Sequence, residues 1–148
     1  MNIQTIAVTV CAPRADVFNF LADIENLPRW AGGYCERIAL VRGRWWALTA
    51  EGDQVVELEA DGRDGVIDLR AGPHPARLNL MPMRVVGLSE RRTLVTLTVI
   101  EAADQTAAAC ARRYRILREA ARGLLARFGG GELHGPAAGL FAVVGGRN

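Results

Sequence analysis

His74 and Arg84 are side chains in this sequence that could take part in acid–base or oxyanion chemistry. His74 stands between two prolines, and its imidazole titrates near neutral pH, which suits a general base. A single histidine in such a rigid loop is nevertheless more often a surface residue. Arg84 interrupts a mostly apolar stretch, where its guanidinium could hold a carboxylate or enolate oxygen of a ligand. It could equally pair with Glu57 or Glu59 on an outer face, so both roles stay open.

Asp68 and Arg70 lie two residues apart, so they share one face of a segment that is otherwise apolar. On an outer face they would form a solvated pair of little energetic value. On an inner face they would need buried partners and would mark a site. We favour the outer placement. Asp68 completes a set of four candidate catalytic residues, together with Tyr34, His74 and Arg84.

Other catalytic and binding signatures are missing from the sequence. It has no Ser-His-Asp, Cys-His or GxSxG arrangement and no P-loop or GxGxxG motif, so nucleophilic catalysis and nucleotide binding lack support. Cys11, Cys35 and Cys110 are widely spaced and form no CxxC or Cys/His cluster. We therefore expect neither a metal nor another cofactor. Three thiols without a framework of disulfides are typical of a reducing cytoplasm.

The composition is that of a single globular domain. The sequence has 148 residues, of which 50% are hydrophobic and 23% are charged, and its net charge is only +2. Nucleic acid is therefore not an expected partner. All 18 basic residues are arginine, which we attribute to a GC-rich genome. The sequence has no basic and apolar leader, and no uncharged stretch of the roughly 20 residues that span a bilayer. We expect a cytoplasmic protein without an integral membrane segment.

Apolar periodicity locates the elements that must position these side chains. A first strand is predicted over 3–10, followed by short helices over 13–22 and 24–29. Pro13 opens the first helix and Asp23 caps the second. After residue 33 the period changes to two, with Gly-rich and Asp-rich turns between the segments. The predicted strands of this antiparallel meander are 34–41, 44–50, 53–60, 65–71, 77–87 and 92–101.

A long helix is predicted over 104–128, with Asp104 as its N-cap and a run of three glycines at its end. One face has an apolar stripe at steps of three and four: Ala107, Cys110, Tyr114, Leu117, Ala121, Leu124 and Phe128. The other face is basic: Arg112, Arg113, Arg115, Arg118 and Arg122. It could attract an anionic membrane or an acidic partner, although a solvated helix surface is the simpler account.

This order of elements resembles the helix-grip fold of the START-like (SRPBCC) superfamily, and in particular its polyketide cyclase/dehydrase-like branch. The opening 12–23, followed by 26–30, looks like the family pattern in which Ala-Pro precedes Val-Phe, an acidic residue and a closing tryptophan. The resemblance covers 1–128. It implies an α+β fold in which a curved antiparallel sheet of six to seven strands wraps round the long C-terminal helix. Residues 129–148 would form a Gly-rich tail, packed on the domain or on a partner subunit.

Members of this superfamily typically hold a hydrophobic ligand between the sheet and the long helix, so the resemblance implies a cavity there. Trp45 and Trp46 are neighbours on a strand, so one ring is expected to enter the interior and the other to cover an outer surface. Methionine adapts to irregular shapes and suits a tolerant pocket. The candidate ligand-binding residues are Trp30, Tyr34, Trp45, Trp46, Met81, Met83, Arg84 and Tyr114.

These observations leave three functional hypotheses open. The first is a carrier or sensor that binds a hydrophobic or aromatic small molecule. The second is a polyketide cyclase/dehydratase-type enzyme in the same cavity, where polar groups assist proton transfer on a reactive chain. The sequence does not decide between binding and turnover. The third is an interaction module that uses the arginine face of the long helix or the apolar tail cluster at 140–144, which could also join two copies in a homodimer.

Overall fold

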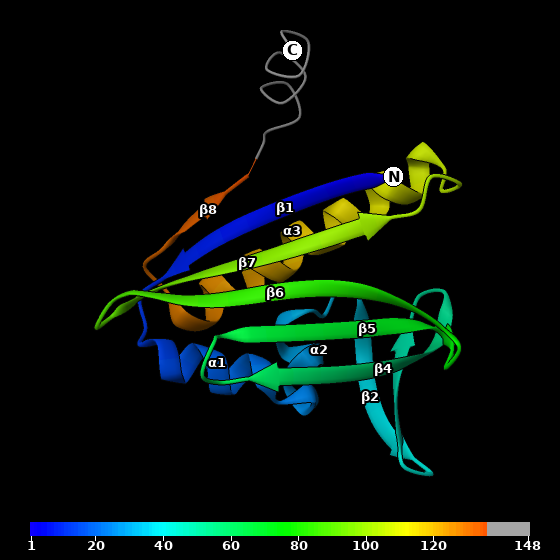
Figure 1. Ribbon diagram of the computed structural model, residues 1–148, viewed down its shortest axis with the longest axis horizontal. Coiled ribbons are helices and arrows are strands. Elements are labelled where there is room, and N and C mark those ends of the chain that lie inside the picture. Colours follow the sequence, from blue (N-terminus) through cyan, green and yellow to red (C-terminus); the bar gives the residue numbers. More distant parts are fainter. Residues whose placement is uncertain (136–148) are drawn as a thin grey trace, which may run out of the picture.

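The computed structural model describes residues 1–135, and Figure 1 shows a curved sheet with one long helix packed along it. The strands are β1 (Asn2–Val10), β2 (Cys35–Val41), β3 (Arg44–Thr49), β4 (Gly52–Asp61), β5 (Val66–His74), β6 (Arg77–Ser89), β7 (Arg92–Glu101) and β8 (Glu132–His134). The helices are α1 (Arg14–Ala22), the short 3-10 helix η1 (Ile24–Asn26), α2 (Leu27–Trp30) and α3 (Ala107–Phe128). This is the α+β class expected from the sequence.

The strands form one antiparallel sheet in the order β2-β3-β4-β5-β6-β7-β1-β8. Strands β2 to β7 are neighbours in sequence and in space because short turns join them. Strand β1 lies beside β7, with Asn2 opposite Glu101. Within residues 1–135 the sheet has eight strands, so the expected six to seven were too few. The additional strand, β8, pairs with Ala7–Thr9 of β1 and falls in the segment predicted to be tail.

The short helices after β1 pack against one end of the concave face. Phe20 of α1 meets the ring of Phe128 edge-on, with 5.5 Å between the ring centroids. The sequence predicted Pro13 as the first helical residue, but in the structure Pro13 is the N-cap of α1, one residue before Arg14, because its backbone is still extended. Asp23 caps η1 as predicted, since its carboxylate accepts a hydrogen bond from the Glu25 N–H at 3.0 Å.

The long helix α3 runs behind β1 and β7 in Figure 1. Its N-cap is Thr106, whose hydroxyl accepts a backbone N–H of the first turn, so α3 begins later than the predicted cap at Asp104. Gly129 ends the helix with a φ of 73°, a left-handed conformation that glycine adopts without strain. The fully buried side chains of α3 are Leu117, Ala120, Ala121 and Leu124.

The core lies between α3 and the inner face of the sheet. On β1 and β7 alternate residues point inward, and Ile6, Val8 and Leu97 are completely buried there. The residues between them point outward, where the Thr5 and Thr98 hydroxyls are joined by a hydrogen bond of 2.8 Å. This alternation decides which side chains of each strand can reach a cavity under the helix.

Within residues 1–135, no helix has the length and apolar character needed to span a bilayer. The apolar cluster at 140–144, which the sequence analysis considered as a contact surface, lies outside the described residues. The division into a 1–128 domain and a 129–148 tail therefore stays a prediction, although 132–134 already belongs to the sheet of the domain.

Candidate functional site

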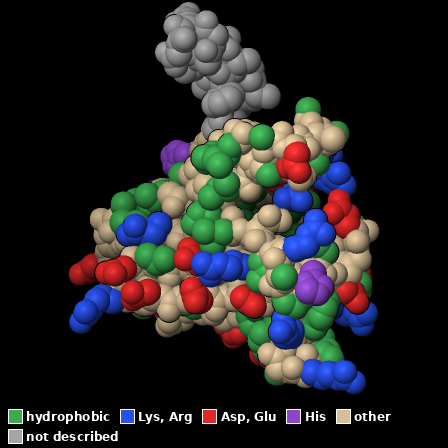
Figure 2. Space-filling model, turned by 45° about the vertical axis from the view of Figure 1, so that its right-hand side comes forward, with side chains coloured by type: hydrophobic (Ala, Val, Ile, Leu, Met, Phe, Trp, Pro, Cys, Tyr) green, Lys and Arg blue, Asp and Glu red, His purple; other side chains and the backbone are tan. Residues whose placement is uncertain are grey.

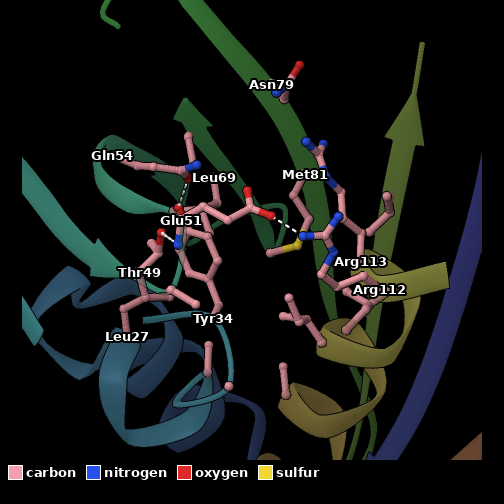
Figure 3. A pocket seen from close by; sticks show the side chains of 18 of the residues that line it. Leu27, Tyr34, Thr49, Glu51, Gln54, Leu69, Asn79, Met81, Arg112 and Arg113 are labelled. Carbon is pink, nitrogen blue, oxygen red and sulfur yellow. Dashed lines mark hydrogen bonds and ion pairs between the residues drawn. The ribbon is translucent and has the colours of Figure 1, made fainter. Parts of the chain in front are cut away.

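A cavity of about 390 Å³ lies between the inner face of the sheet, α2 and one face of α3. Figure 3 shows it from close by, with side chains from the sheet and from α3 pointing toward a common space. The helix α3 packs on β1, β7 and β8, whereas most strand residues of the cavity wall belong to β3, β4, β5 and β6. A volume of this size suits a small organic molecule.

Most of the cavity wall is apolar. Leu69 and Ala71 of β5 and Met81 of β6 line it from the sheet, and Ile116 and Leu117 line it from α3. The β5 residues belong to the inward row of their strand, so the wall continues the core without a break. An apolar ligand that displaced water from this wall would gain hydrophobic free energy.

Polar side chains gather at one end of the cavity. The Tyr34 hydroxyl donates a hydrogen bond of 2.6 Å to Oε1 of Gln54 on β4, and both residues line the cavity. Burial raises the pKa of Tyr34 well above its usual value of 10.0; the neighbouring Cys35 raises it further and Arg113 opposes the shift. Tyr34 is therefore a neutral phenol at ordinary pH, which binds by hydrogen bonds and does not serve as a phenolate base.

An ion pair crosses the edge of the cavity at the same end. Glu51 in the β3–β4 turn pairs with Arg112 of α3, 61 residues later in the sequence, and both line the cavity. Figure 3 shows the pair reaching from the turn to the helix. The side chains are 58% and 52% exposed, so water screens the attraction and the pair adds little to stability. Its main effect on the cavity is that the two charges neutralise each other.

A second ion pair lies deeper. Glu101 ends β7 with a side chain that is only 1% exposed, and its Oε1 lies 3.3 Å from Nη1 of Arg113. In the described part of the chain, that oxygen accepts no hydrogen bond, and Oε2 has the Cys110 thiol at 3.8 Å. Arg113 lines the cavity, whereas Glu101 stands behind it. Among residues 1–135, no cluster of three or more His, Cys, Asp or Glu could bind a metal ion.

Three of the predicted ligand-binding residues line the cavity: Trp30, Tyr34 and Met81. Met83 is buried in the core, two residues further along the inward row of β6. Tyr114 packs against the core from α3 without lining the cavity. Neither Met83 nor Tyr114 can contact a ligand unless the cavity extends beyond its present walls.

The two adjacent tryptophans occupy opposite faces of β3, as strand geometry requires. Trp45 packs against the core, and Trp46 stands beside Val55 on the other face of the sheet. Neither ring lines the cavity, because β3 lies next to the edge of the sheet and the cavity opens further along, at the β3–β4 turn.

The four catalytic candidates do not converge in the described structure, and of the four only Tyr34 lines the cavity. Arg84 is exposed on β6 and donates to the backbone carbonyl of Asp64 at 3.2 Å, so it pairs with neither of the acids considered for it. His74 is exposed at the end of β5, where its Nδ1 accepts the backbone N–H of Ala76 at 3.1 Å. Both side chains have local roles on the surface.

Asp68 and Arg70 take the outer face of β5, the placement favoured from the sequence. The buried Ile67 and Leu69 occupy the inner face, so the alternation places the charged residues outside. Arg70 forms an ion pair of 3.3 Å with Glu59 of the neighbouring strand. This contact is solvated and marks no site.

Glu101 was not predicted as a site residue, and Arg113 was predicted only as part of the basic face of the long helix, although the sequence has a signal that places each at the cavity. Glu101 continues the inward row of Val95, Leu97 and Val99 on β7. Arg113 comes three residues after Cys110 and four before Leu117, which places it at the border of the apolar stripe of the helix. An acidic residue and an arginine on the facing sides of two packed elements predict an ion pair between them.

The predicted basic face of α3 is therefore smaller than expected. Arg112 and Arg113 line the cavity and pair with acids, whereas Arg115 and Arg122 are exposed and are not part of the cavity wall. Figure 2 shows basic and acidic side chains interspersed over one face of the molecule, with no large patch of a single sign. The use of the remaining arginines as a contact surface stays a prediction.

No family model and no curated protein matches this sequence. Solved structures match the fold. A START superfamily protein from Mycobacterium smegmatis has a TM-score of 0.64 and 14% identity, over 85% of this chain and 96% of that chain. The Zhui aromatase/cyclase from Streptomyces sp. R1128 has a TM-score of 0.61 and 19% identity, over 85% and 93% of the two chains.

The Aha1 dimer from Colwellia psychrerythraea has a TM-score of 0.59 and 13% identity, over 86% of this chain and 94% of that chain. At such low identities the likeness shows the fold alone. The chain has the START-like helix-grip fold, as the resemblance of its opening segment suggested. Because that fold supports several unrelated tasks, function has to be argued from the cavity.

Proposed function

We propose that this helix-grip domain binds a hydrophobic or aromatic small molecule in the cavity, as a carrier or a sensor. The observation that supports the proposal is the cavity itself: about 390 Å³, with apolar walls and a cluster of polar groups at one end. Apolar walls with a few placed polar groups are the usual composition of small-molecule sites. The START-like neighbours agree with this function without identifying a ligand.

The first experiment measures binding of N-phenyl-1-naphthylamine, an uncharged aromatic probe that becomes fluorescent in apolar surroundings. The wild-type protein is expected to bind it with micromolar affinity. Ala109→Trp places an indole on the cavity wall, because Ala109 lines the cavity from α3. We expect this variant to lose about tenfold or more in affinity, since the ring takes the space of the probe.

Ala111→Trp is the matched control. Ala111 lies two residues further on the same helix, is exposed and is not part of the cavity wall. It should bind the probe like the wild type, and unfolding curves of both variants verify that each is folded. Failure of the wild type to bind, or equal binding by the two tryptophan variants, would contradict a ligand site in this cavity.

The alternative is an enzyme of the polyketide cyclase/dehydratase type, and one observation favours it: polar groups meet at one end of an otherwise apolar cavity. Tyr34 and Gln54 could hydrogen-bond the oxygens of a flexible polyketone chain, and the walls could fold that chain for ring closure. Against it, three of the four catalytic candidates lie outside the cavity in the described chain.

Incubation with a poly-β-ketone thioester tests whether the protein only binds such a molecule or also converts it. Its ring closure is an intramolecular aldol reaction, in which an enol carbon attacks a carbonyl carbon and loss of water gives the aromatic ring. The enzyme hypothesis expects aromatic absorbance to rise faster with protein than without it, and Tyr34→Phe to slow the rise. A rate equal to that of the protein-free solution would reject the enzyme hypothesis.

A homodimer also stays a prediction, and a measurement of the molar mass in solution can test it.

A further inference from the structure

We propose that the ligand has an anionic oxygen group, such as a carboxylate, at one end of its apolar body, and that Arg113 binds this group. The inference rests on the proposed function and specifies the chemical class of the ligand: an apolar acid. It starts from the ion pair between Arg113, which lines the cavity, and the buried Glu101, which stands behind the wall.

The buried carboxylate is the first observation. The inward row of β7 is apolar up to Val99, which lines the cavity, and the next inward residue is Glu101. Its side chain is 1% exposed, and within residues 1–135 its Oε1 accepts no hydrogen bond. Burial of a charge is costly unless a partner of opposite charge compensates for it. Glu101 compensates for the positive charge of Arg113, whose partly exposed side chain lines the mostly apolar cavity wall.

The unused donors of Arg113 are the second observation. A guanidinium has five N–H donors and no acceptor. In the described chain its acidic partner is Glu101, which lies 3.3 Å from Nη1 and is not part of the cavity wall. The Arg113 side chain is 40% exposed and lines the cavity, so N–H groups remain for a molecule bound there.

The surrounding polar groups also favour an acceptor on the ligand. The Gln54 carbonyl oxygen already accepts the Tyr34 hydroxyl, which leaves the amide N–H groups of Gln54 as donors. The Glu51 carboxylate is already paired with Arg112. All of these groups line the cavity, and Arg113 lies close enough to Tyr34 to lower the pKa of that phenol. A carboxylate there would receive charge-assisted hydrogen bonds.

A matched pair of probes tests the inference. The 8-sulfonate of N-phenyl-1-naphthylamine has the same aromatic skeleton plus one anionic group with acceptor oxygens. The wild type is expected to bind the sulfonate more tightly than the uncharged parent. Arg113→Gln should lower affinity for the sulfonate by about tenfold or more and leave affinity for the parent nearly unchanged. Arg115→Gln, which changes an exposed arginine of the same helix, is the control.

Glu101→Gln distinguishes recognition from a purely structural ion pair, because it breaks the same pair from the other side. If Arg113 binds the anion, Glu101→Gln keeps or increases the preference for the sulfonate, since a competing carboxylate is gone. If the pair only fastens α3 to β7, both variants should weaken the two probes in parallel. If Arg113→Gln does not fold, the double variant Glu101→Gln/Arg113→Gln replaces it in the binding experiment. The double variant removes both charges of the pair, so no carboxylate stays buried without a partner.

The two proposals fail separately. If the uncharged parent does not bind to the wild type, or binds unchanged to Ala109→Trp, the cavity proposal fails. If the parent binds in the cavity but the preference for the sulfonate is absent, or survives in Arg113→Gln, the cavity proposal stands and the anionic group is rejected.

Discussion

Tyr34 and Cys35 follow each other where the chain enters β2, and burial raises the pKa of both side chains. The Cys35 thiol is 1% exposed, and its pKa rises from the usual 9.0 to about 11. The folded protein favours the neutral thiol because an apolar environment destabilises the thiolate. The chain has no lysine, so few other side chains titrate just above pH 9.

Stability should therefore fall as the pH rises from 9. Above its usual pKa of 9.0, Cys35 is ionised in the unfolded chain but still protonated in the folded protein. Each rise in pH then favours the unfolded state, whereas below pH 9 the contribution is complete. We expect a loss of about 1 kcal/mol between pH 9 and pH 10. Urea unfolding curves at these two pH values measure it.

Two alanine variants show which thiol is responsible. Cys35→Ala should remove most of the decline between pH 9 and pH 10, and above that range the buried Tyr34 adds its own decline. Cys11→Ala changes an exposed thiol and should keep the wild-type slope. An undiminished slope in Cys35→Ala would show that another group causes the alkaline loss.

Some residues of the site were predictable, and others depend on the tertiary structure. Trp30 and Met81 were predicted to contact a ligand, and they do line the cavity. The pair of Glu101 and Arg113 follows from strand and helix periods, but the basic residues had been explained by genome composition. The hydrogen bond from Tyr34 to Gln54 could not be predicted, because it depends on how the segment after α2 meets β4.

At the scale of elements, α2 and α3 approach each other closely at Gly123. A Cβ atom there would lie 2.5 Å from the carbonyl oxygen of Trp30, well inside van der Waals contact. Trp30 ends α2 and lines the cavity, so this contact sets how near the cavity wall stands to the helix. Glycine serves here as the smallest residue, not as a helix breaker.

Gly123→Ala should destabilise the protein by about 1 to 3 kcal/mol, although alanine is the better helix former. The methyl group must push α2 away from α3, and urea unfolding midpoints measure the loss. Ala126→Gly is the control, at an exposed position of the same helix. It should lose about 1 kcal/mol from helix propensity alone. If Gly123→Ala were stabilising, the helices would not be in contact at this point.

The elements themselves were predicted well where their signal is local. The six strands of the meander begin and end within a few residues of their predicted bounds, because turns and alternation are encoded in neighbouring residues. Strand β8 was not predicted because three residues are too few to show an alternation of apolar and polar side chains. Its partner β1 is also far away in sequence. Asp104 and Thr106 are both residue types that favour the N-cap position. Thr106 is the N-cap because Asp104 belongs to the turn at Ala102–Gln105 that precedes the helix.

At the scale of the whole molecule, the fold was accessible from the order of the elements and the opening motif. The cavity was implied by resemblance only, because its position depends on how far the sheet curves from α3. Sequence patterns assign residues to the two faces of a strand, but several inward residues, such as Met83, fill the core instead of the cavity. Distinguishing the two needs the three-dimensional packing of the helix.

The position of β1 between β7 and β8 has a consequence for how the molecule is made. The hydrogen bond between Thr5 and Thr98 joins residues that are 93 positions apart, so the first strand emerges from the ribosome long before its partner exists. Closing such a long loop is slow, because its entropic cost precedes any gain from the contacts. The helix that forms the other wall of the cavity is synthesised later still. A nascent chain therefore cannot enclose the cavity before α3, which ends at Phe128, has been synthesised, and a filled cavity would be a sign that residues 1–128 have folded.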